Sequence, residues 1–117
     1  MSEKIREILA QRMKKSIEGS DAVPAAVLIP LFKKAGHLYV LFTKRTERVE
    51  HHKGQICFPG GASSPEDDTP LVTALREAYE EVGIREVDVD VLGSLDDLIT
   101  STNFLVSPFV GVIPYPY

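Results

Sequence analysis

The sequence predicts a single α+β domain, and two kinds of pattern carry that prediction. Apolar residues recur at three- and four-residue spacing over 3–17 and again over 70–82, which is typical of amphipathic helices. Apolar runs rich in β-branched residues, at 25–32, 38–43 and 104–114, are typical of strands. With 117 residues, of which 44% are hydrophobic, the chain suits one core of modest stability.

The first expected element is an N-terminal helix over residues 3–17, which ends before the turn-forming segment 19–21. Its apolar side chains share one side: Ile5, Ile8, Leu9, Met13 and Ile17. Packing on the domain or on a partner subunit explains this stripe better than binding at a membrane surface. We therefore divide the chain into an N-terminal amphipathic helix, residues 1–21, and a main domain, residues 22–117.

Four runs before and after the second helix are read as strands: 25–32, 38–43, 55–58 and 87–92. A turn at 34–36 joins the first two into a pair. The last apolar run, 104–114, contains Pro108. Because proline cannot donate a ladder hydrogen bond, Pro108 predicts a break or an edge position in that strand.

The segment 60–83 reads as a glycine loop followed by a helix. Three residues are candidates for the helix N-cap: Asp67, Asp68 and Thr69. Pro70 follows them, and proline is favoured in the first turn of a helix. One stripe of the helix is apolar: Leu71, Ala74, Leu75, Ala78 and Val82. Gly83 then provides a natural C-terminal stop.

Three carboxylates gather on one face of this helix. Because successive residues turn by about 100°, Glu80 and Glu81 fall within roughly 60° of Glu77. Like charges this close repel one another, and a hard divalent cation, which prefers oxygen ligands, removes the repulsion. An acidic helix alone is more often only a solvated face. The tight turn Phe58-Pro59-Gly60-Gly61 and the buried stripe favour a metal platform for phosphate chemistry instead.

This stretch resembles the Nudix box, the glycine, Arg-Glu and Glu-Glu pattern of the Nudix hydrolases. Five residues separate Gly61 from Asp67, and eight separate Asp67 from Arg76, where the usual box has seven. The resemblance implies a mixed β-sheet between helices, an α/β/α sandwich. It also implies cleavage of a nucleoside diphosphate linked to another group, with Mg²⁺ or Mn²⁺ as cofactor.

The longer spacing is similar to that of the coenzyme A pyrophosphatase-like subgroup. An upstream motif of that subgroup is matched by three segments: Leu41-Phe42-Thr43-Lys44-Arg45-Thr46, Gly54-Gln55 and Phe58-Pro59-Gly60-Gly61. Coenzyme A or a derivative is therefore the first substrate implied. Glu50, however, stands where the subgroup usually has arginine, which reverses a charge and favours ADP-ribose, dinucleoside polyphosphates or other nucleotides. A non-catalytic Nudix-type binding domain is the remaining alternative.

The resemblance also implies roles for the box residues. Glu77 and Glu81 are expected as the steadiest metal ligands, with Glu80 as a third ligand or as the base that activates water. Arg76 is expected to orient a box glutamate through a salt bridge. Asp67 either assists through water or caps the helix. Five residues are expected to meet the substrate: Arg45, Gly54, Gln55, Gly60 and Gly61.

Composition limits the partners. The formal net charge of −4, without a basic stripe, argues against nucleic acid. A single cysteine, Cys57, allows no internal disulfide, which suits a reducing compartment, and we expect a cytoplasmic protein. No apolar run reaches membrane-spanning length. The expected partner is a small-molecule nucleotide diphosphate. The polar segments 96–97 and 100–103 read as a solvated turn, or as a loop that closes over this substrate.

The resemblance implies a second main helix after the strand near 109–113. The sequence ends at Tyr117, so we expect the fold to lack that helix. The sheet face beneath it would then expose an apolar patch, which the N-terminal helix covers in part. Such a patch predicts self-association into a homo-oligomer.

Overall fold

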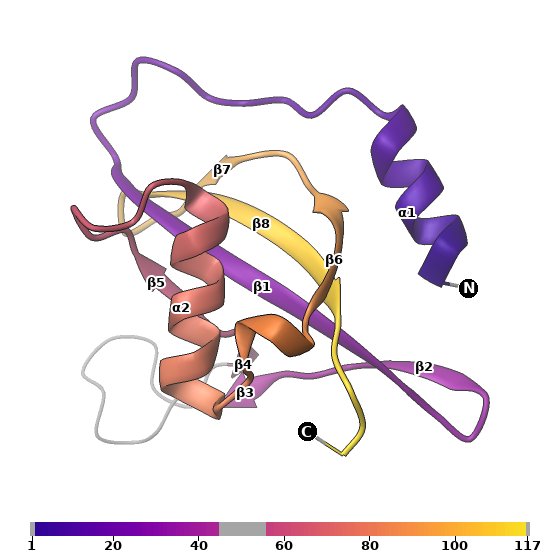
Figure 1. Cartoon of the computed structure of the whole chain (residues 1–117). Coiled ribbons are helices and arrows are strands. Elements are labelled where there is room, and N and C mark those ends of the chain that lie inside the picture. Colours follow the sequence, from indigo (N-terminus) through magenta and orange to yellow (C-terminus); the bar gives the residue numbers. More distant parts are fainter. Residues whose placement is uncertain (1, 45–55, 117) are drawn as a thin grey trace.

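The computed structural model describes residues 2–44 and 56–116, and in them a mixed sheet lies between two helices (Figure 1). The elements in chain order are α1 (Ser2–Gln11), β1 (Val23–Lys34), β2 (His37–Val40), β3 (Thr43–Lys44), β4 (Ile56–Cys57), β5 (Gly60–Ala62), α2 (Pro70–Val82), the 3-10 helix η1 (Glu86–Asp88), β6 (Asp90–Ser94), β7 (Leu98–Ile99) and β8 (Phe104–Val112). The predicted α/β/α sandwich is confirmed.

The long strands β1 and β8 form the centre of the sheet. They pair in parallel, with Val23 opposite Phe104 and Leu31 opposite Val112. The strand order is β2-β1-β8-β6, with β5 also on β1 and β7 also on β8, and these outer pairings are antiparallel. The predicted pairing of the first two strands is present as β1 and β2. β3 and β4 form a separate antiparallel pair.

Pro108 lies inside β8, between β1 on one side and β6 and β7 on the other, so the expected break or edge position is wrong. In a strand, the N–H and C=O of one residue point to the same side. The Pro108 carbonyl accepts from the Leu95 N–H at 3.0 Å, at the interval between the β6 and β7 pairings. Pro30 in β1 uses the equivalent interval between β2 and β5, where its carbonyl accepts from Leu41 at 2.9 Å. Proline has no N–H, and both Pro108 and Pro30 lie at positions where the neighbouring strands leave no N–H bond to be made.

One face of the sheet is covered by α2. The core on this face consists of Ala26, Leu28, Ala74, Ala78, Ile84 and Ile113. Ala74 and Ala78 are fully buried, and their small side chains let the helix lie close to β1. The helix also lies against β5, where Glu77 meets Gly61.

The opposite face is covered in part by α1, as expected. Its core consists of Leu31, Leu92 and Val110, against which Ile5 and Leu9 pack. The Arg6 guanidinium holds both carboxylate oxygens of Asp90 at 2.7 Å and so fixes α1 beside β6. Self-association through the remainder of this face stays a prediction.

Helix α1 ends at Gln11, so the prediction of a helix to residue 17 is wrong in its extent. The last helical bond runs from the Arg12 N–H to the Ile8 carbonyl at 3.1 Å, and beyond it the backbone bonds to the loop between β6 and β7. The Lys15 N–H donates to Asp96 at 2.9 Å, the Ile17 N–H donates to Asp97 at 3.2 Å, and the Lys15 carbonyl accepts from the Asp97 N–H at 3.0 Å. These tertiary bonds replace the helical ones.

The predicted strand 87–92 is also corrected. Residues 86–88 form η1, closed by an N–H of Asp88 that donates to the Arg85 carbonyl at 2.9 Å, and the strand begins only at Asp90. The Arg85 guanidinium binds the Asp88 carboxylate at 3.0 Å, which favours the turn. Val87 is 81% exposed on this turn.

Within the described residues, no helix is long and apolar enough to cross a membrane. Residues 113–116, which follow β8, are not helical.

A substitution at Gly93 tests whether α1 packs against β6 as described. A Cβ atom added there would lie 2.7 Å from the Cβ of Leu9, which belongs to the stem of that side chain and cannot swing away. We expect Gly93→Ala to displace α1, at a cost of about 1–3 kcal/mol typical of overpacking. Hydrogen exchange of residues 2–11 should accelerate while exchange of α2 stays unchanged. Unchanged protection of α1 would contradict this seating.

Candidate active site

Two glycines of β5 let this strand lie directly against its neighbours. A Cβ atom added at Gly60 would overlap the Ala26 carbonyl oxygen, and one added at Gly61 would lie 2.7 Å from the carboxyl carbon of Glu77. Gly60 therefore allows the strand to approach β1, and Gly61 leaves space for a carboxylate of α2.

Helix α2 begins and ends where its sequence predicts. Of the three N-cap candidates the structure uses Thr69, whose Oγ1 accepts from the Val72 N–H at 3.2 Å, and Pro70 is the first helical residue. Gly83 takes the left-handed conformation with φ 75°, and its N–H donates to the Tyr79 carbonyl at 2.9 Å. These caps fix the position along the sheet at which the helix presents its carboxylates.

The Arg76 guanidinium joins the loop to the carboxylates of the helix. Its Nε and Nη2 donate to the two carboxylate oxygens of Asp67 at 3.0 and 2.9 Å. Its Nη1 donates to Glu77 at 2.7 Å and to Glu80 at 3.1 Å, and Nη2 also reaches the Ala62 carbonyl at 3.2 Å. The expected salt bridge between Arg76 and a box glutamate is present, and it belongs to a larger network.

Asp67 is the buried end of this network, with a side chain 3% exposed. It also accepts from the Ser64 N–H at 3.0 Å and from the Thr73 hydroxyl at 2.8 Å. The Arg76 guanidinium, followed by the Ser64 N–H, holds the pKa of Asp67 well below its usual range. In turn, Asp67 raises the pKa of Arg76, so both groups keep their charge. The expectation that Asp67 caps the helix is wrong.

Thr73 was not singled out by the sequence, although it is fully buried and bonds both Asp67 and the Ser63 hydroxyl. Its position next to the apolar stripe of the helix is the sequence signal that could have identified Thr73 as a buried polar residue. Thr73 lies one turn before Glu77, so the same side of α2 carries the anchor of the loop and the first carboxylate.

Glu81 also faces the glycine loop, because one of its carboxylate oxygens accepts from the Gly60 N–H at 3.3 Å. Glu77 lies beneath Gly61, and Glu80 is held by Arg76 at the solvent side, where its side chain is 54% exposed. The structure therefore brings the three predicted glutamates to the junction of β5 and α2.

The donor chemistry of this junction fits a hard divalent cation. Three carboxylates, of Asp67, Glu77 and Glu80, share the positive charge of Arg76, and Glu81 lies at the same junction. Glu77, Glu80 and Glu81 offer oxygen ligands of the kind Mg²⁺ prefers. As the side chains are placed, no three such groups in the described part of the chain already enclose a metal position. Arg76 draws Glu77 and Glu80 toward itself, whereas Glu81 turns toward Gly60.

The structure either does not describe the other predicted residues or places them elsewhere. Arg45, Gly54 and Gln55, together with Glu50, lie outside the described residues. Asp96 and Asp97 bind the segment after α1, and Lys14 lies 3.2 Å from the Asp97 carboxylate. The Thr100 hydroxyl accepts from the Phe104 N–H at 3.1 Å and so closes the turn before β8. In this arrangement these polar groups hold the N-terminal segment and a turn.

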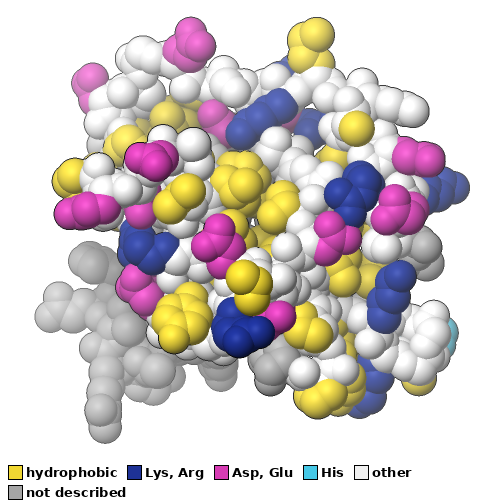
Figure 2. Space-filling model, viewed as in Figure 1, with side chains coloured by type: hydrophobic (Ala, Val, Ile, Leu, Met, Phe, Trp, Pro, Cys, Tyr) yellow, Lys and Arg dark blue, Asp and Glu magenta, His cyan; other side chains and the backbone are white. Residues whose placement is uncertain are grey.

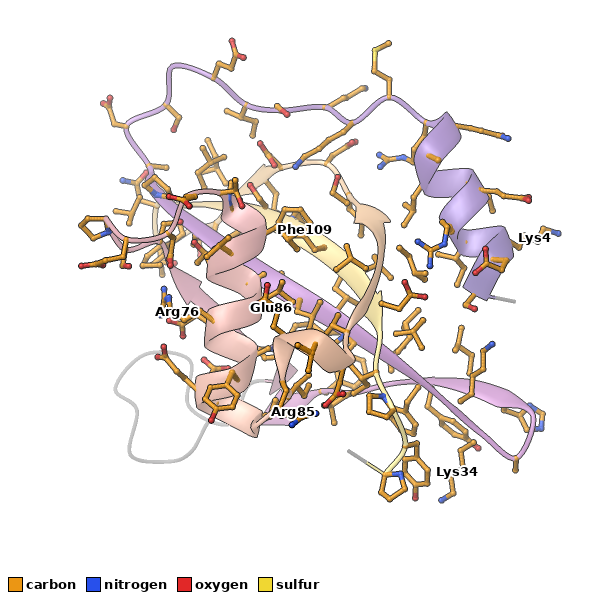
Figure 3. All side chains as sticks on the ribbon, in the orientation of Figure 1. Lys4, Lys34, Arg76, Arg85, Glu86 and Phe109 are labelled. Carbon is orange, nitrogen blue, oxygen red and sulfur yellow. The ribbon has the colours of Figure 1, made fainter. Side chains whose placement is uncertain are left out.

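A groove of about 470 Å³ lies between α2 and η1. Its lining is mostly apolar: Val72, Leu75, Arg76, Tyr79, Arg85, Glu86 and Val87. Figure 2 shows the face of the molecule that carries α2 and η1, on which hydrophobic side chains lie among charged ones. Tyr79 is turned about 200° around the helix from Glu77, so the groove lies on another side of α2 than Glu77, and only Arg76 belongs to both. In Figure 3, Arg76 projects from α2, whereas Arg85 and Glu86 lie beyond the end of that helix.

Comparison with known proteins agrees with this fold. A family model described as the NUDIX domain matches residues 22–112. The chain therefore belongs to the Nudix family, and the resemblance seen in the sequence is confirmed.

Curated relatives match a large part of the chain. The peroxisomal coenzyme A diphosphatase NUDT7 of Mus musculus is 39% identical over 92 residues, which are 79% of this chain and 39% of that protein. NudL of Photorhabdus laumondii, an uncharacterized Nudix hydrolase, is 46% identical over 90 residues, 77% of this chain and 48% of that protein. The chain thus spans about half the length, or less, of these two relatives.

Solved structures share the fold at low identity. A binary complex of the C. elegans Ap4A hydrolase superimposes with a TM-score of 0.68 at 21% identity, covering 80% of this chain and 67% of that one. RenU, a Nudix hydrolase from M. smegmatis, gives a TM-score of 0.65 at 21% identity, covering 80% and 63%. These similarities establish the Nudix fold.

The lowered pKa of Asp67 makes a testable contribution to stability. Because the folded-state pKa lies below the unfolded value of about 3.9, the contribution is present above that pH and is lost as the pH falls through the folded value. We expect Asp67→Asn to lower the free energy of unfolding at pH 7, with a smaller difference from wild type near pH 2. Urea unfolding at both pH values measures this, with Asp68→Asn at the exposed neighbour as control. Equal effects at both pH values would contradict it.

The two loop glycines should respond differently to one added methyl group. At Gly60 the group meets backbone, whereas at Gly61 it meets the end of the flexible Glu77 side chain. We expect Gly60→Ala to lower the melting temperature by at least about 5 °C, and Gly61→Ala to leave it within about 2 °C of wild type. Thermal unfolding followed by circular dichroism distinguishes them, and equal losses would refute the contrast.

Proposed function

We propose that this chain is a metal-dependent hydrolase that cleaves the diphosphate bond of a nucleoside-diphosphate-linked substrate, with coenzyme A or a derivative as the first candidate. The observation that carries the proposal is the Arg76 network, which sets Glu77 and Glu80 beside the glycine loop while Glu81 bonds to that loop. Coenzyme A is supported by the upstream motif and by the 39% identity with a coenzyme A diphosphatase.

Glu77, Glu80 and Glu81 would hold the cofactor, and we expect Mg²⁺ or Mn²⁺. Such an ion, when bound, withdraws charge from diphosphate oxygens and lowers the pKa of an attacking water. Glu77 and Glu81 face the loop backbone and suit the role of steady ligands. Glu80 is exposed and suits either a third ligand or the base that takes a proton from water.

Arg76 acts as a positioning residue. Its bidentate pairing with the buried Asp67 fixes the plane of the guanidinium, and the remaining nitrogen then orients Glu77 and Glu80. Gly61 supports the same arrangement, because any larger residue would displace the Glu77 carboxylate. A displacement of about 1 Å at such a site costs on the order of 100-fold in rate.

The substrate is expected to lie along the loop backbone of Gly60 and Gly61. Arg45, Gly54 and Gln55 complete the proposed binding set on the strength of the sequence resemblance. The proposed compartment is the cytoplasm, from cysteine usage.

A second candidate substrate class is ADP-ribose, a dinucleoside polyphosphate or another nucleotide. Glu50, which stands in place of the arginine of the subgroup, favours it, because a carboxylate there repels an anionic substrate group. A panel of CoA, ADP-ribose, diadenosine polyphosphates and nucleoside triphosphates, run with Mg²⁺ and with Mn²⁺, separates the candidates. Release of 4′-phosphopantetheine from CoA supports the first candidate, and no turnover of any member would leave only a binding domain.

Glu81→Gln tests the ligand assignment. The amide keeps the size of the side chain but loses the negative charge, so we expect the hydrolysis rate to fall more than about 100-fold, since even outer-shell partners of metals cost 10- to 100-fold. The melting temperature should stay close to wild type. Glu7→Gln, at an exposed position of α1, is the matched control and should keep full activity. A fully active Glu81→Gln variant would refute the assignment.

A further inference from the structure

Two phenylalanines form a stacked pair beside the glycine loop. The rings of Phe42 and Phe58 have centroids 5.2 Å apart and planes at 28°. They flank the short β3–β4 pairing, in which Thr43 lies opposite Cys57, so the two residues face each other across the strands. Phe58 is half-buried, whereas Phe42 is 54% exposed. The pair therefore has one supported ring that remains open to solvent.

The backbone of this pair is fixed relative to the glutamates. Pro59, which follows Phe58, is fully buried, and its carbonyl accepts from the Leu28 N–H of β1 at 2.9 Å. The next residue, Gly60, donates its N–H to Glu81. Since consecutive Cα atoms are about 3.8 Å apart, the Cα of Phe58 lies within roughly 7.6 Å of the Cα of Gly60.

The other ring is anchored independently. Leu41, which precedes Phe42, donates its N–H to the Pro30 carbonyl of β1 at 2.9 Å and packs against the core beneath α2. Both members of the stack are thus attached to the central strand within one or two residues. An aromatic surface held in this way can accept a planar ligand without ordering a flexible side chain first, which reduces the entropic cost of binding.

The chemistry of an open, supported aromatic ring suits a nucleobase. Stacking of a base on an aromatic side chain contributes about 1–3 kcal/mol, and it is available to every base because each has a π face. Purines offer more stacking surface than pyrimidines. Because the base of a nucleoside diphosphate is joined to its diphosphate through one ribose, a base stacked on Phe42 would belong to the same ligand as a diphosphate at the glutamates.

We propose that Phe42, supported by Phe58, is the base-stacking residue of the substrate site and takes the purine of the nucleoside diphosphate. This inference rests on the proposed function, because it assumes that the diphosphate lies at Glu77, Glu80 and Glu81.

Binding can be observed apart from catalysis, because the sequence contains no tryptophan. Phe42→Trp places a single fluorophore in the stack, and ADP, added with Mg²⁺, should quench its emission. Ribose 5-phosphate and pyrophosphate, which lack the base, should not. Tyr115→Trp is the matched control: Tyr115 is 46% exposed and stacks on Phe32 at 5.1 Å. Phe32 lies five residues along β1 from Val27, the partner of Gly60, or about 17 Å away.

Quenching by ADP at position 42 and none at 115 is the expected result. Absence of quenching at 42, or equal quenching at both positions, overturns the inference.

Kinetics supply an independent measurement. We expect Phe42→Leu to raise KM for the nucleotide substrate by about 5- to 150-fold, the equivalent of one lost stacking contact, with kcat changed less than about threefold. Phe42→Tyr should keep the wild-type KM. An unchanged KM in Phe42→Leu, with wild-type turnover intact, overturns the stacking role and leaves the proposed hydrolase standing. Conversely, quenching at position 42 without turnover of any substrate would contradict the proposed hydrolase activity and support the base-stacking site.

A second copy of the chain is the competing occupant of an exposed ring. Sedimentation of wild type and Phe42→Leu at equal concentration separates the two, since loss of a dimer in the variant would identify Phe42 as an interchain contact and overturn the inference.

Discussion

The pairing of Arg76 with Asp67 is the interaction on which the site depends. Asp67 is almost excluded from water, and the guanidinium, the Ser64 N–H and the Thr73 hydroxyl around it stabilise its charged carboxylate. With two of its nitrogens committed to Asp67, Arg76 has a fixed plane, and its third nitrogen reaches Glu77 and Glu80. Removal of Arg76 would leave the charge of Asp67 in a poorly solvated position, which is far more costly than loss of a surface ion pair.

The same pairing explains how the longer loop is accommodated. The loop has one residue more than the usual Nudix box before the arginine, and its acidic residue is aspartate, one methylene shorter than glutamate. Both oxygens of Asp67 nevertheless reach Arg76, and the Ser64 N–H closes the loop onto the same carboxylate. A longer backbone path is thus combined with a shorter side chain. The small Ala74 and Ala78 complete the arrangement, since they seat α2 close enough to β1 for Gly61 to meet Glu77.

Sequence patterns predicted the features that depend on neighbouring residues, namely the ends of α2 and the side of the helix that carries the glutamates. Pro70 and Gly83 marked the ends of α2, and a turn of 100° per residue placed Glu77, Glu80 and Glu81 together. The end of α1 and the place of Pro108 depend instead on bonds between distant segments. α1 ends early because Asp96 and Asp97 bind the backbone beyond it, and Pro108 is tolerated because two antiparallel partners leave an interval opposite it.

The parts of the site that the sequence did not reveal also depend on contacts between distant segments. The roles of Asp67 and Thr73 depend on the path of the loop between them, and no short-range pattern encodes that path. The stack of Phe42 on Phe58 depends on the register of β3 against β4. Only the pairing of distant segments brings such residues into contact.

The parallel pairing of β1 with β8 has a consequence for the way this molecule is made. Val23 lies opposite Phe104, so nearly the whole domain must leave the ribosome before its central strands meet. Until then β1 has an unpaired edge and apolar side chains that β8 and the helices will later cover. Contacts so distant in sequence slow folding, because chain entropy is lost before they form. During synthesis, an incomplete chain therefore exposes the strand most prone to pair with another molecule.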